Sequence, residues 1–303
     1  MVRGKRTKPG KDFKSGYAIL LGRPNAGKST LLNAMLGEEI SIVTPKPQTT
    51  RNRILGIATT DDYQVIFLDT PGVVRSERGL KAFLAREIQR AMADADVIVL
   101  LVEPFGEPKP SERELIEKLK KLNRPVVLAI NKVDKVKKEN LLPLMELYQE
   151  LHAWQAIVPV SALKKNGVEA VLAEVVKAMP TGPMYYPPDQ FTDATERFIV
   201  AEMIREQVFR QTRQEIPFSS AVLVQSFKEF EGIVHIAAEI FVEREGQKGI
   251  VIGKNGEMLK RIGTAARQKI ETFLGRKVFL ELYAKVKKDW TRSESKMREV
   301  GYQ

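Results

Sequence analysis

Residues 22–29 of this chain read Gly-Arg-Pro-Asn-Ala-Gly-Lys-Ser, and this stretch decides the fold of the first half. The apolar run Tyr17–Leu21 precedes it and a helical pattern begins at Lys28, which is the context that a G-x-x-x-x-G-K-S phosphate-binding loop (P-loop) requires. In such a loop, backbone N–H groups surround the phosphates, the lysine bridges the terminal phosphates and the serine binds Mg²⁺. The predicted nucleotide-binding residues are Gly22, Arg23, Pro24, Asn25, Ala26, Gly27, Lys28, Ser29 and Thr30.

Short apolar runs alternate with amphipathic stretches along the first 180 residues. Helical spacing covers residues 111–122 and 167–179. This alternation predicts an α/β domain with a mainly parallel six-stranded sheet and helices on both faces. The expected strands are Tyr17–Leu21, Ile54–Ala58, Val65–Leu68, Val97–Val102, Val126–Ile130 and Ile157–Val160.

Two further motifs follow predicted strands of this sheet. Asp69-Thr70-Pro71-Gly72 places a carboxylate beside the expected Mg²⁺ and a glycine amide near a γ-phosphate. In Asn131-Lys132-Val133-Asp134, the aspartate can accept hydrogen bonds from N1 and the exocyclic amine of guanine, whereas adenine offers neither donor. Because a carboxylate left without these donors is costly, the motif favours GTP over ATP.

Two shorter stretches complete the predicted GTP site. Ser161-Ala162-Leu163 resembles a backbone element that caps guanine O6. In the loop Pro47–Arg51 a threonine must reach Mg²⁺ and the γ-phosphate, and we favour Thr50, with Thr49 as the other candidate. The predicted Mg²⁺ ligands are Ser29, Thr50 and Asp69, and the predicted catalytic residues are Lys28, Thr50, Asp69 and Gly72.

A proline-rich stretch separates this domain from a second one. Residues 179–188 contain four prolines and a glycine, which suit neither a helix nor a central strand. Beyond it, Asp193 and Glu196 resemble a helix capping box. Strands are expected over 218–227, 233–242 and 277–283, with a helix over 256–273. The expected organisation is a basic arm at 1–14, a GTP-binding domain at 15–180, a linker at 181–191 and a second domain with a basic tail at 192–303.

The second domain carries the loop Gly253-Lys254-Asn255-Gly256 between two predicted helices. With its flanking strands, this matches the G-x-x-G loop of an α+β type II K-homology (KH) domain, which lets an RNA backbone approach closely. Ile250, Val251, Ile252, Leu259 and Ile262 are expected to form the apolar wall under the bases and the core. The predicted RNA-binding residues are Ile252, Gly253, Lys254, Asn255, Gly256, Lys260, Arg261, Lys285, Lys287 and Lys288.

Charge and composition agree with a polyanionic partner. The formal net charge is +11, and basic residues concentrate at the two ends of the chain. The absence of cysteine excludes disulfides, thiolate zinc sites and cysteine nucleophiles. No apolar run of about eighteen residues predicts a membrane span, and the basic N-terminus is not followed by signal-peptide features. We therefore expect a cytoplasmic protein.

Taken together, the motifs of residues 15–286 resemble the Era family of ribosome-associated GTPases, one of the TrmE-Era-like GTPases. The resemblance implies hydrolysis of GTP to GDP and phosphate with Mg²⁺. It also implies binding of the 3′ end of 16S rRNA by the KH domain, and assistance in assembly and maturation of the 30S subunit. It further implies some peripheral association with the cytoplasmic face of the inner membrane. We expect a monomer that does not bind DNA, and the arm at 1–14 lies outside the family pattern.

Two other functions compete with this interpretation. One is a membrane or cell-division GTPase whose basic C-terminal domain binds lipid head groups or protein. The other is an RNA-modifying enzyme in which the GTPase domain serves a catalytic module, but no acid–base constellation outside the GTPase motifs supports it. Selective binding to single-stranded RNA over anionic vesicles, dependent on Gly253 and Gly256, would separate RNA binding from lipid binding.

The mode of hydrolysis rests on two positions. Val73 follows Gly72 where many regulatory GTPases carry the glutamine that orients water, so we expect slow intrinsic hydrolysis or another water-positioning element. Related GTPases with G-x-P-N-x-G-K-S use the asparagine to bind K⁺, and we hypothesise the same for Asn25. Single-turnover hydrolysis should then be faster in KCl than in NaCl at equal ionic strength, and equal rates would contradict the hypothesis.

Overall fold

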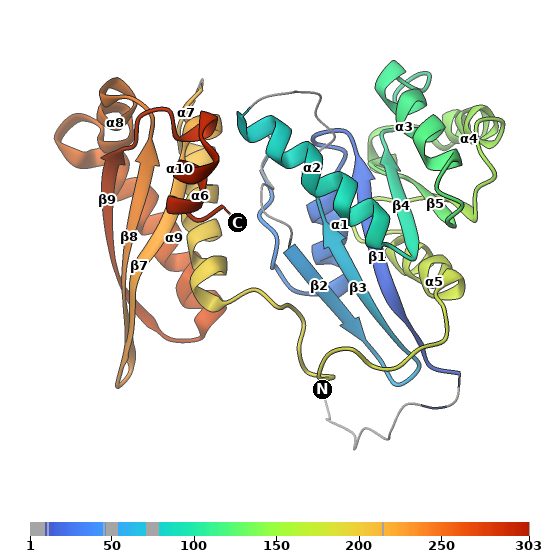
Figure 1. Cartoon of the computed structure of the whole chain (residues 1–303), viewed down its shortest axis with the longest axis horizontal. Helices are drawn as coiled ribbons and strands as arrows, with labels where there is room; N and C mark the ends of the chain where they lie inside the picture. Colours follow the sequence, from blue (N-terminus) through green and yellow to red (C-terminus); the bar gives the residue numbers. More distant parts are fainter. Residues whose placement is uncertain are drawn as a thin grey trace. The chain divides into compact units, whose positions relative to one another are not determined.

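The computed structural model describes residues 10, 12–44, 46, 54–70, 79–213 and 215–302 (Figure 1). These residues form two compact units. The first contains most of the chain up to Asp193, and the second begins at Ala194. The described residues of the segments Ile42–Asn52 and Arg75–Leu84 also group with the second unit. The boundaries of the predicted domains and linker stay predictions.

A six-stranded sheet in the order β2-β3-β1-β4-β5-β6 organises the first unit. β2 is antiparallel to β3, and every other neighbouring pair is parallel. This confirms the predicted α/β sheet, and the bounds of the observed strands differ from the predicted ones by a few residues at most. Their bounds are β1 Lys14–Gly22, β2 Ile54–Thr59, β3 Tyr63–Asp69, β4 Val97–Val102, β5 Val126–Ile130 and β6 Ala156–Pro159.

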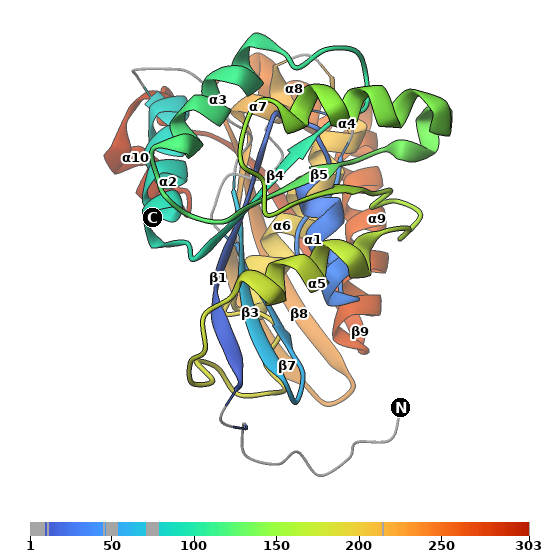
Figure 2. The ribbon, with the colours of Figure 1, turned by 90° about the vertical axis from the view of Figure 1, so that its right-hand side faces the viewer.

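The strands β4 and β5 are apolar and buried at every residue. Strands of this kind need cover on both sides, and helices cover both faces of this sheet. α1 and α5 contact each other on one face (Figure 2). Apolar residues of α2, α3 and α4 join alternate residues of the strands in the core of the other face. The helices are α1 Lys28–Leu36, α2 Gly79–Asp94, α3 Pro110–Lys120, α4 Leu141–Gln149 and α5 Val168–Ala178.

The proline-rich stretch is bound to the first unit along its edge. Ser15 N–H donates to Pro180 O at 3.0 Å, and Gly182 N–H donates to Phe13 O at 3.0 Å. The buried Gln64 amide accepts from the backbone N–H groups of Tyr185 and Tyr186 and donates to Tyr186 O. A stretch with few backbone donors is thus fixed by side-chain and strand-edge partners instead of by its own secondary structure.

The second unit has the element order of a type II KH domain. Its sheet runs β7-β8-β9, with β7 antiparallel and β9 parallel to β8. Apolar residues of α6, α8 and α9 pack with alternate strand residues in one core. The bounds are α6 Glu196–Gln211, α7 Ile216–Ser219, β7 Ala221–Phe230, β8 Ile233–Val242, α8 Glu245–Ile252, α9 Glu257–Leu274, β9 Lys277–Val286 and α10 Glu294–Glu299.

Three local predictions for this unit were wrong. α6 is capped by Thr195, whose hydroxyl accepts from Phe198 N–H at 3.3 Å, so the proposed capping box at Asp193 does not form. Phe218 lies in the short helix α7, because Pro217 favours the first turn of a helix, and β7 starts at Ala221. Ile250 was expected to belong to the core as well as to the apolar wall under the bases, but it is an exposed residue of α8 and is not part of the core.

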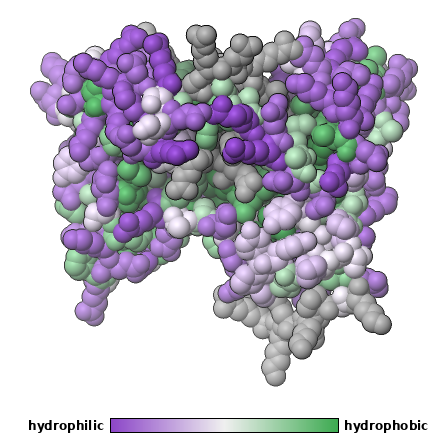
Figure 3. All heavy atoms as spheres, viewed as in Figure 1, coloured by the Kyte–Doolittle hydropathy of each residue, from purple (hydrophilic) through white to green (hydrophobic). Residues whose placement is uncertain are grey.

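No helix among the described residues is long and apolar enough to cross a membrane. The face of each unit seen in Figure 3 is mostly hydrophilic, and its apolar side chains lie in small groups.

The C-terminal segment packs onto the second unit through Trp290. This side chain is fully buried, its Nε1–H donates to Ser219 O at 3.0 Å, and its ring stacks on Tyr302 with centroids 5.4 Å apart. Met297 and Val300 bury their side chains in the same cluster. The prediction that Trp290 is a packing anchor is confirmed.

Replacing Trp290 should therefore destabilise this unit. We expect Trp290→Ala to lower the free energy of unfolding by about 3 to 5 kcal/mol, since it leaves a large cavity and an unpaired Ser219 carbonyl. Arg292→Ala is the control, because that side chain is 77% exposed. Urea denaturation followed by circular dichroism measures both, and equal transition midpoints for the two variants would contradict the anchoring role.

Candidate nucleotide and RNA sites

The P-loop follows β1 and ends in the first turn of α1. Its glycines are required by close contacts, since a Cβ at Gly22 would come 2.4 Å from Leu101 O and one at Gly27 would come 2.1 Å from Asn131 Nδ2. Both have positive φ, 146° and 99°. Between them, Ala26 N–H donates to Arg23 O at 3.2 Å and closes a turn. Close packing and an internal hydrogen bond therefore define the shape of the loop.

Lys28 lies inside this loop and is 7% exposed. Its ammonium donates to Gly22 O and to Arg23 O, both at 3.2 Å. Burial lowers the pKa of Lys28 to about 8, while the nearby Asp69 carboxylate acts in the opposite direction. An ammonium with this pKa is still mostly protonated at pH 7 and can meet an anionic phosphate oxygen.

Ser29 and Asp69, the two predicted Mg²⁺ ligands that the structure describes, are in direct contact. Ser29 Oγ donates to Asp69 Oδ2 at 2.8 Å, and the Asp69 side chain is fully buried at the carboxyl end of β3. A hydroxyl and a carboxylate are the hard oxygen ligands that Mg²⁺ prefers. No group of three or more His, Asp or Glu side chains in the described parts of the chain could hold a metal.

Asn131 joins the P-loop to the loop after β6. Its side chain is buried, its Nδ2 donates to Ala26 O at 2.8 Å and its Oδ1 accepts from Ala162 N–H at 3.0 Å. Lys132 reaches the P-loop as well, since its Nζ donates to Asn25 O at 2.6 Å and pairs with Glu103. The predicted base-binding motifs thus converge on the phosphate-binding loop.

Asp134 is oriented by Ser161, whose Oγ donates to Asp134 Oδ1 at 2.5 Å. This hydrogen bond is the main reason that the pKa of Asp134 is lowered. The carboxylate therefore stays ionised and keeps acceptor capacity for a base. Leu163 follows on the surface, 75% exposed.

Some predicted residues are not near these contacts or are not described. Thr49, Thr50, Pro71 and Gly72 lie outside the described residues. Thr70 is buried and its Oγ1 donates to Leu20 O at 2.8 Å, which makes it part of the strand framework.

Sequence reasoning missed Ser41. The Ser41 Oγ donates to Asp69 Oδ2 at 2.5 Å. Asn33 on α1 holds the Ser41 backbone with two hydrogen bonds: Asn33 Nδ2 donates to Ser41 O at 2.7 Å, and Ser41 N–H donates to Asn33 Oδ1 at 3.0 Å. Neither residue belongs to a recognisable motif. Only the folded chain brings this serine to the predicted metal ligand.

In the second unit, the G-x-x-G loop joins α8 to α9. Gly253, Asn255 and Gly256 have positive φ values of 74°, 52° and 78°. A Cβ at Gly253 would lie 2.7 Å from Met258 Cβ, so the turn requires glycine there. Lys254 and Asn255 are exposed at the tip of the loop.

A groove of about 320 Å³ runs from this loop along α9 and β9. Its floor is apolar, and its α9 side carries the cations Lys260 and Arg267. The groove is lined by Gly256, Leu259, Lys260, Gly263, Thr264, Arg267, Leu280 and Leu282. Of these, the predicted RNA-binding set contained Gly256 and Lys260 only.

The structure does not bring the predicted basic residues of β9 and its extension to this groove. Side chains alternate along β9, so Lys285 lies on the face opposite Leu280 and Leu282, where it pairs with Glu239. Lys287 pairs with Glu299. Lys288 is exposed beyond the end of the strand. A run of lysines in the sequence did not reveal which face each would occupy.

Comparison with known proteins agrees with both sites. The family described as 50S ribosome-binding GTPase matches residues 17–132, and the KH domain family matches residues 215–291. GTPase Era of Geotalea uraniireducens is 50% identical over 294 residues, covering 97% of this chain and 99% of that protein. GTPase Era of Syntrophus aciditrophicus is 48% identical over 292 residues, covering 96% and 95%.

Two solved structures resemble the chain over nearly its whole length. One is an Aquifex aeolicus Era variant bound to GDP·AlF₄⁻, and the other is Era in complex with MgGDPNP and nucleotides 1506–1542 of 16S ribosomal RNA. Each has a TM-score of 0.92 and 39% identity, and covers 96% of this chain and 99% of the other. With a GTPase domain, a KH domain and full-length relatives at this identity, the chain belongs to the Era family of GTPases.

Proposed function

We propose that this GTPase is a nucleotide switch whose KH domain binds the 3′ end of 16S rRNA and assists assembly and maturation of the 30S subunit. One observation supports the proposal above all. A single chain holds a P-loop bonded to Asn131, a nearby aspartate held by Ser161 that suits guanine, and a G-x-x-G loop that opens onto a cationic groove. The related Era structure with a GTP analogue and 16S rRNA nucleotides supports this combination.

At the nucleotide, the P-loop amides and Lys28 bind and orient the phosphates. GTP and Mg²⁺ are the substrate and the metal of this family, and Mg²⁺ supplies charge neutralisation at the transferred phosphate. Ser29 and Asp69 are the protein groups that would hold the metal, with Thr50 as the third proposed ligand. Lys28 stabilises the negative charge that develops on the phosphate oxygens. Thr50 and the backbone amide of Gly72 contact the γ-phosphate in the proposed GTP-bound state.

At the base, Asp134 selects guanine. Its carboxylate accepts from two adjacent N–H donors of guanine, while Ser161 holds it in place. Asn131 contributes to recognition of the base because it bonds to both the P-loop and the loop after β6, and so keeps the two loops at a fixed separation. Adenine lacks both donors, so it would leave the carboxylate without partners.

At the RNA, the G-x-x-G loop contacts the backbone and the groove receives the bases. Gly253 and Gly256 adopt the positive φ values that glycine permits, and because glycine has no Cβ, phosphates can approach the main chain there. Leu259, Leu280 and Leu282 give the bases an apolar floor. Lys260 and Arg267 flank it with positive charge.

We place the protein in the cytoplasm, with some peripheral association with the cytoplasmic face of the inner membrane, as the family resemblance implies. A lipid-binding or protein-binding role for the basic second domain is the competing function. The groove beside the G-x-x-G loop favours RNA, because lipid head groups have no need of an apolar floor between a helix and a strand.

Asp134→Asn tests the base site. The substitution replaces an acceptor with an amide that suits the C2 carbonyl of xanthine, so GTP affinity should fall about 100-fold or more while XTP affinity rises. Asp61→Asn, an exposed aspartate in the turn before β3, is the matched control. Calorimetric titration with GDP, GTP and XTP measures the change. An unaltered GTP affinity in Asp134→Asn would show that the guanine edge is read elsewhere.

Gly253→Asp tests the proposed function as a whole. For the unaltered protein we expect RNA copied from the 3′ end of 16S rRNA to bind about tenfold more tightly with a GTP analogue than with GDP, or about 1.4 kcal/mol of coupling. Gly253→Asp should lose RNA binding because a side chain there collides with Met258 and adds negative charge. Lys254→Ala should weaken it with no effect on the loop backbone.

Gly249→Asp is the matched control for this experiment. It adds the same charge on α8, where nothing lies within 4 Å of the new Cβ. Equal losses in Gly249→Asp and Gly253→Asp would mean that only general charge attracts RNA. Direct binding of anionic vesicles by the unaltered protein, with no binding of the RNA, would favour the lipid-binding function.

A further inference from the structure

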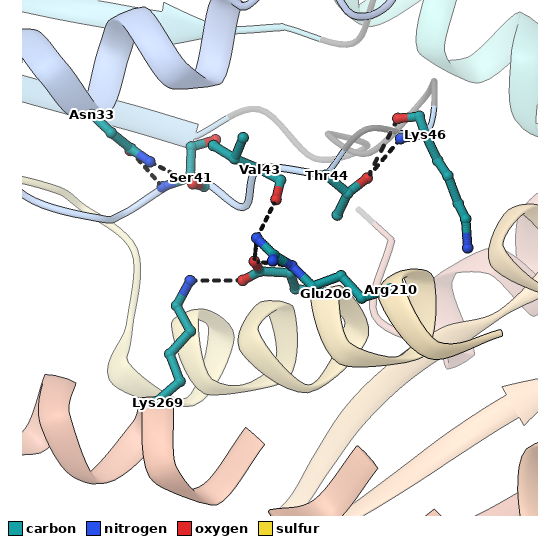
Figure 4. Close-up of polar contacts among 8 residues, drawn as sticks. All are labelled: Asn33, Ser41, Val43, Thr44, Lys46, Glu206, Arg210 and Lys269. Carbon is teal, nitrogen blue, oxygen red and sulfur yellow. Dashed lines mark hydrogen bonds and ion pairs between the residues drawn. The ribbon is translucent and has the colours of Figure 1, made fainter. Parts of the chain in front are cut away.

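Helix α6 carries a buried carboxylate that joins two other segments of the second unit. Glu206 is 1% exposed. Its Oε1 accepts from Arg210 Nε at 2.9 Å, and its Oε2 accepts from Lys269 Nζ at 2.7 Å (Figure 4). Because a buried carboxylate is costly without partners, Glu206 holds both cations in defined positions.

One of these cations reaches the segment Ile42–Lys46. Arg210 Nη2, 2.8 Å from Glu206 Oε1, also donates to Val43 O at 3.0 Å. Figure 4 shows the guanidinium between the carboxylate and this backbone carbonyl. From the same segment, Lys46 Nζ contacts Phe209 O and Thr212 O at the C-terminal end of α6, where carbonyls lack helical partners and attract a cation.

The segment directly follows a residue that is hydrogen-bonded to a predicted metal ligand. Ser41, which donates to Asp69 and is held by Asn33, precedes Ile42 directly. Two peptide bonds therefore separate Ser41, which donates to Asp69, from Val43, whose carbonyl accepts from Arg210. A shift of Val43 must be transmitted to Ser41 or absorbed in the backbone of Ile42.

The other cation reaches the helix that carries the RNA groove. Lys269 belongs to α9, which starts directly after the G-x-x-G loop and supplies Lys260 and Arg267 to the groove. A second contact lies nearer the loop, where Gln211 Nε2 of α6 donates to Arg261 O at 3.2 Å. The C-terminal half of α6 thus contacts α9 on one side and residues 43–46 on another.

We propose that Glu206 and Arg210 are positioning residues for GTP hydrolysis, through which RNA bound along α9 changes the placement of Val43 and hence of Ser41 beside Asp69. The inference rests on the proposed function, since it takes RNA as the ligand of the α9 groove. RNA that moves Lys269 changes how Glu206 shares its oxygens with Arg210, and Arg210 in turn strengthens or releases its bond to Val43 O. Neither residue touches the substrate.

The test compares kcat and KM for GTP with and without RNA of the sequence of nucleotides 1506–1542 of 16S rRNA. Arg210→Ala should abolish the RNA-induced change in kcat, while KM for GTP and the affinity for RNA stay within about twofold of the unaltered protein. Arg210→Lys should restore part of the effect, because an ammonium can still pair with Glu206. Glu206→Gln should lose it, because the neutral amide no longer holds both cations.

Arg197→Ala is the matched control. Arg197 is an exposed arginine in the first turn of the same helix and donates to a backbone carbonyl, Phe227 O of β7. Among the described residues, no hydrogen bond or ion pair joins it to α9, Val43 or Lys46. It should retain the full RNA effect. Backbone hydrogen exchange at Val43 and Thr44 should rise in Arg210→Ala and not in Arg197→Ala.

The possible results distinguish failure of the positioning role from failure of the proposed RNA-binding function. If RNA binds and Arg210→Ala keeps the unaltered RNA effect on kcat, the positioning role is wrong and the RNA-binding function stands. If RNA binds but leaves kcat unchanged in the unaltered protein, the positioning role is also wrong. If RNA does not bind, both proposals are overturned.

Discussion

The buried amide of Asn131 is the contact on which the nucleotide site depends. It donates to the P-loop at Ala26 and accepts from the loop after β6 at Ala162, so phosphate recognition and base recognition are held in one geometry. The absence of a side chain at Gly27 gives the amide its room. Because the amide is shielded from water, losing either hydrogen bond would leave a buried polar group without its partner.

The parallel sheet explains why these groups can meet at all. Lys28, Asp69, Asn131 and Ser161 are far apart in sequence, but Asp69 ends a strand and each of the others follows the carboxyl end of one. In a parallel sheet those ends lie along one edge. The apolar strands between α2, α3 and α4 on one face and α1 and α5 on the other supply the rigid base. The chemistry is thus placed on loops and the precision comes from the strands.

In the KH unit, a buried polar network has a comparable organising role. α6 carries Glu206 and the Glu202–Arg205 pair inside an otherwise apolar environment. Such groups add little net stability compared with apolar side chains, but they have few alternative arrangements that satisfy them. Their value here is orientation, since Glu206 fixes one cation toward α9 and another toward Val43.

The sequence by itself determined the α/β sheet, the P-loop, the position of the aspartate that we propose selects guanine, and the G-x-x-G loop, because each is a local pattern whose spacing follows strand and helix geometry. Only the tertiary structure decided the roles of Ser41, Asn33 and Arg267, and the position of Lys285 on the face of β9 away from the groove. These depend on which residues distant in the chain are neighbours after folding. The tertiary structure also decided that Thr195 is the N-cap of α6, since several adjacent residues can cap a helix and packing selects one of them.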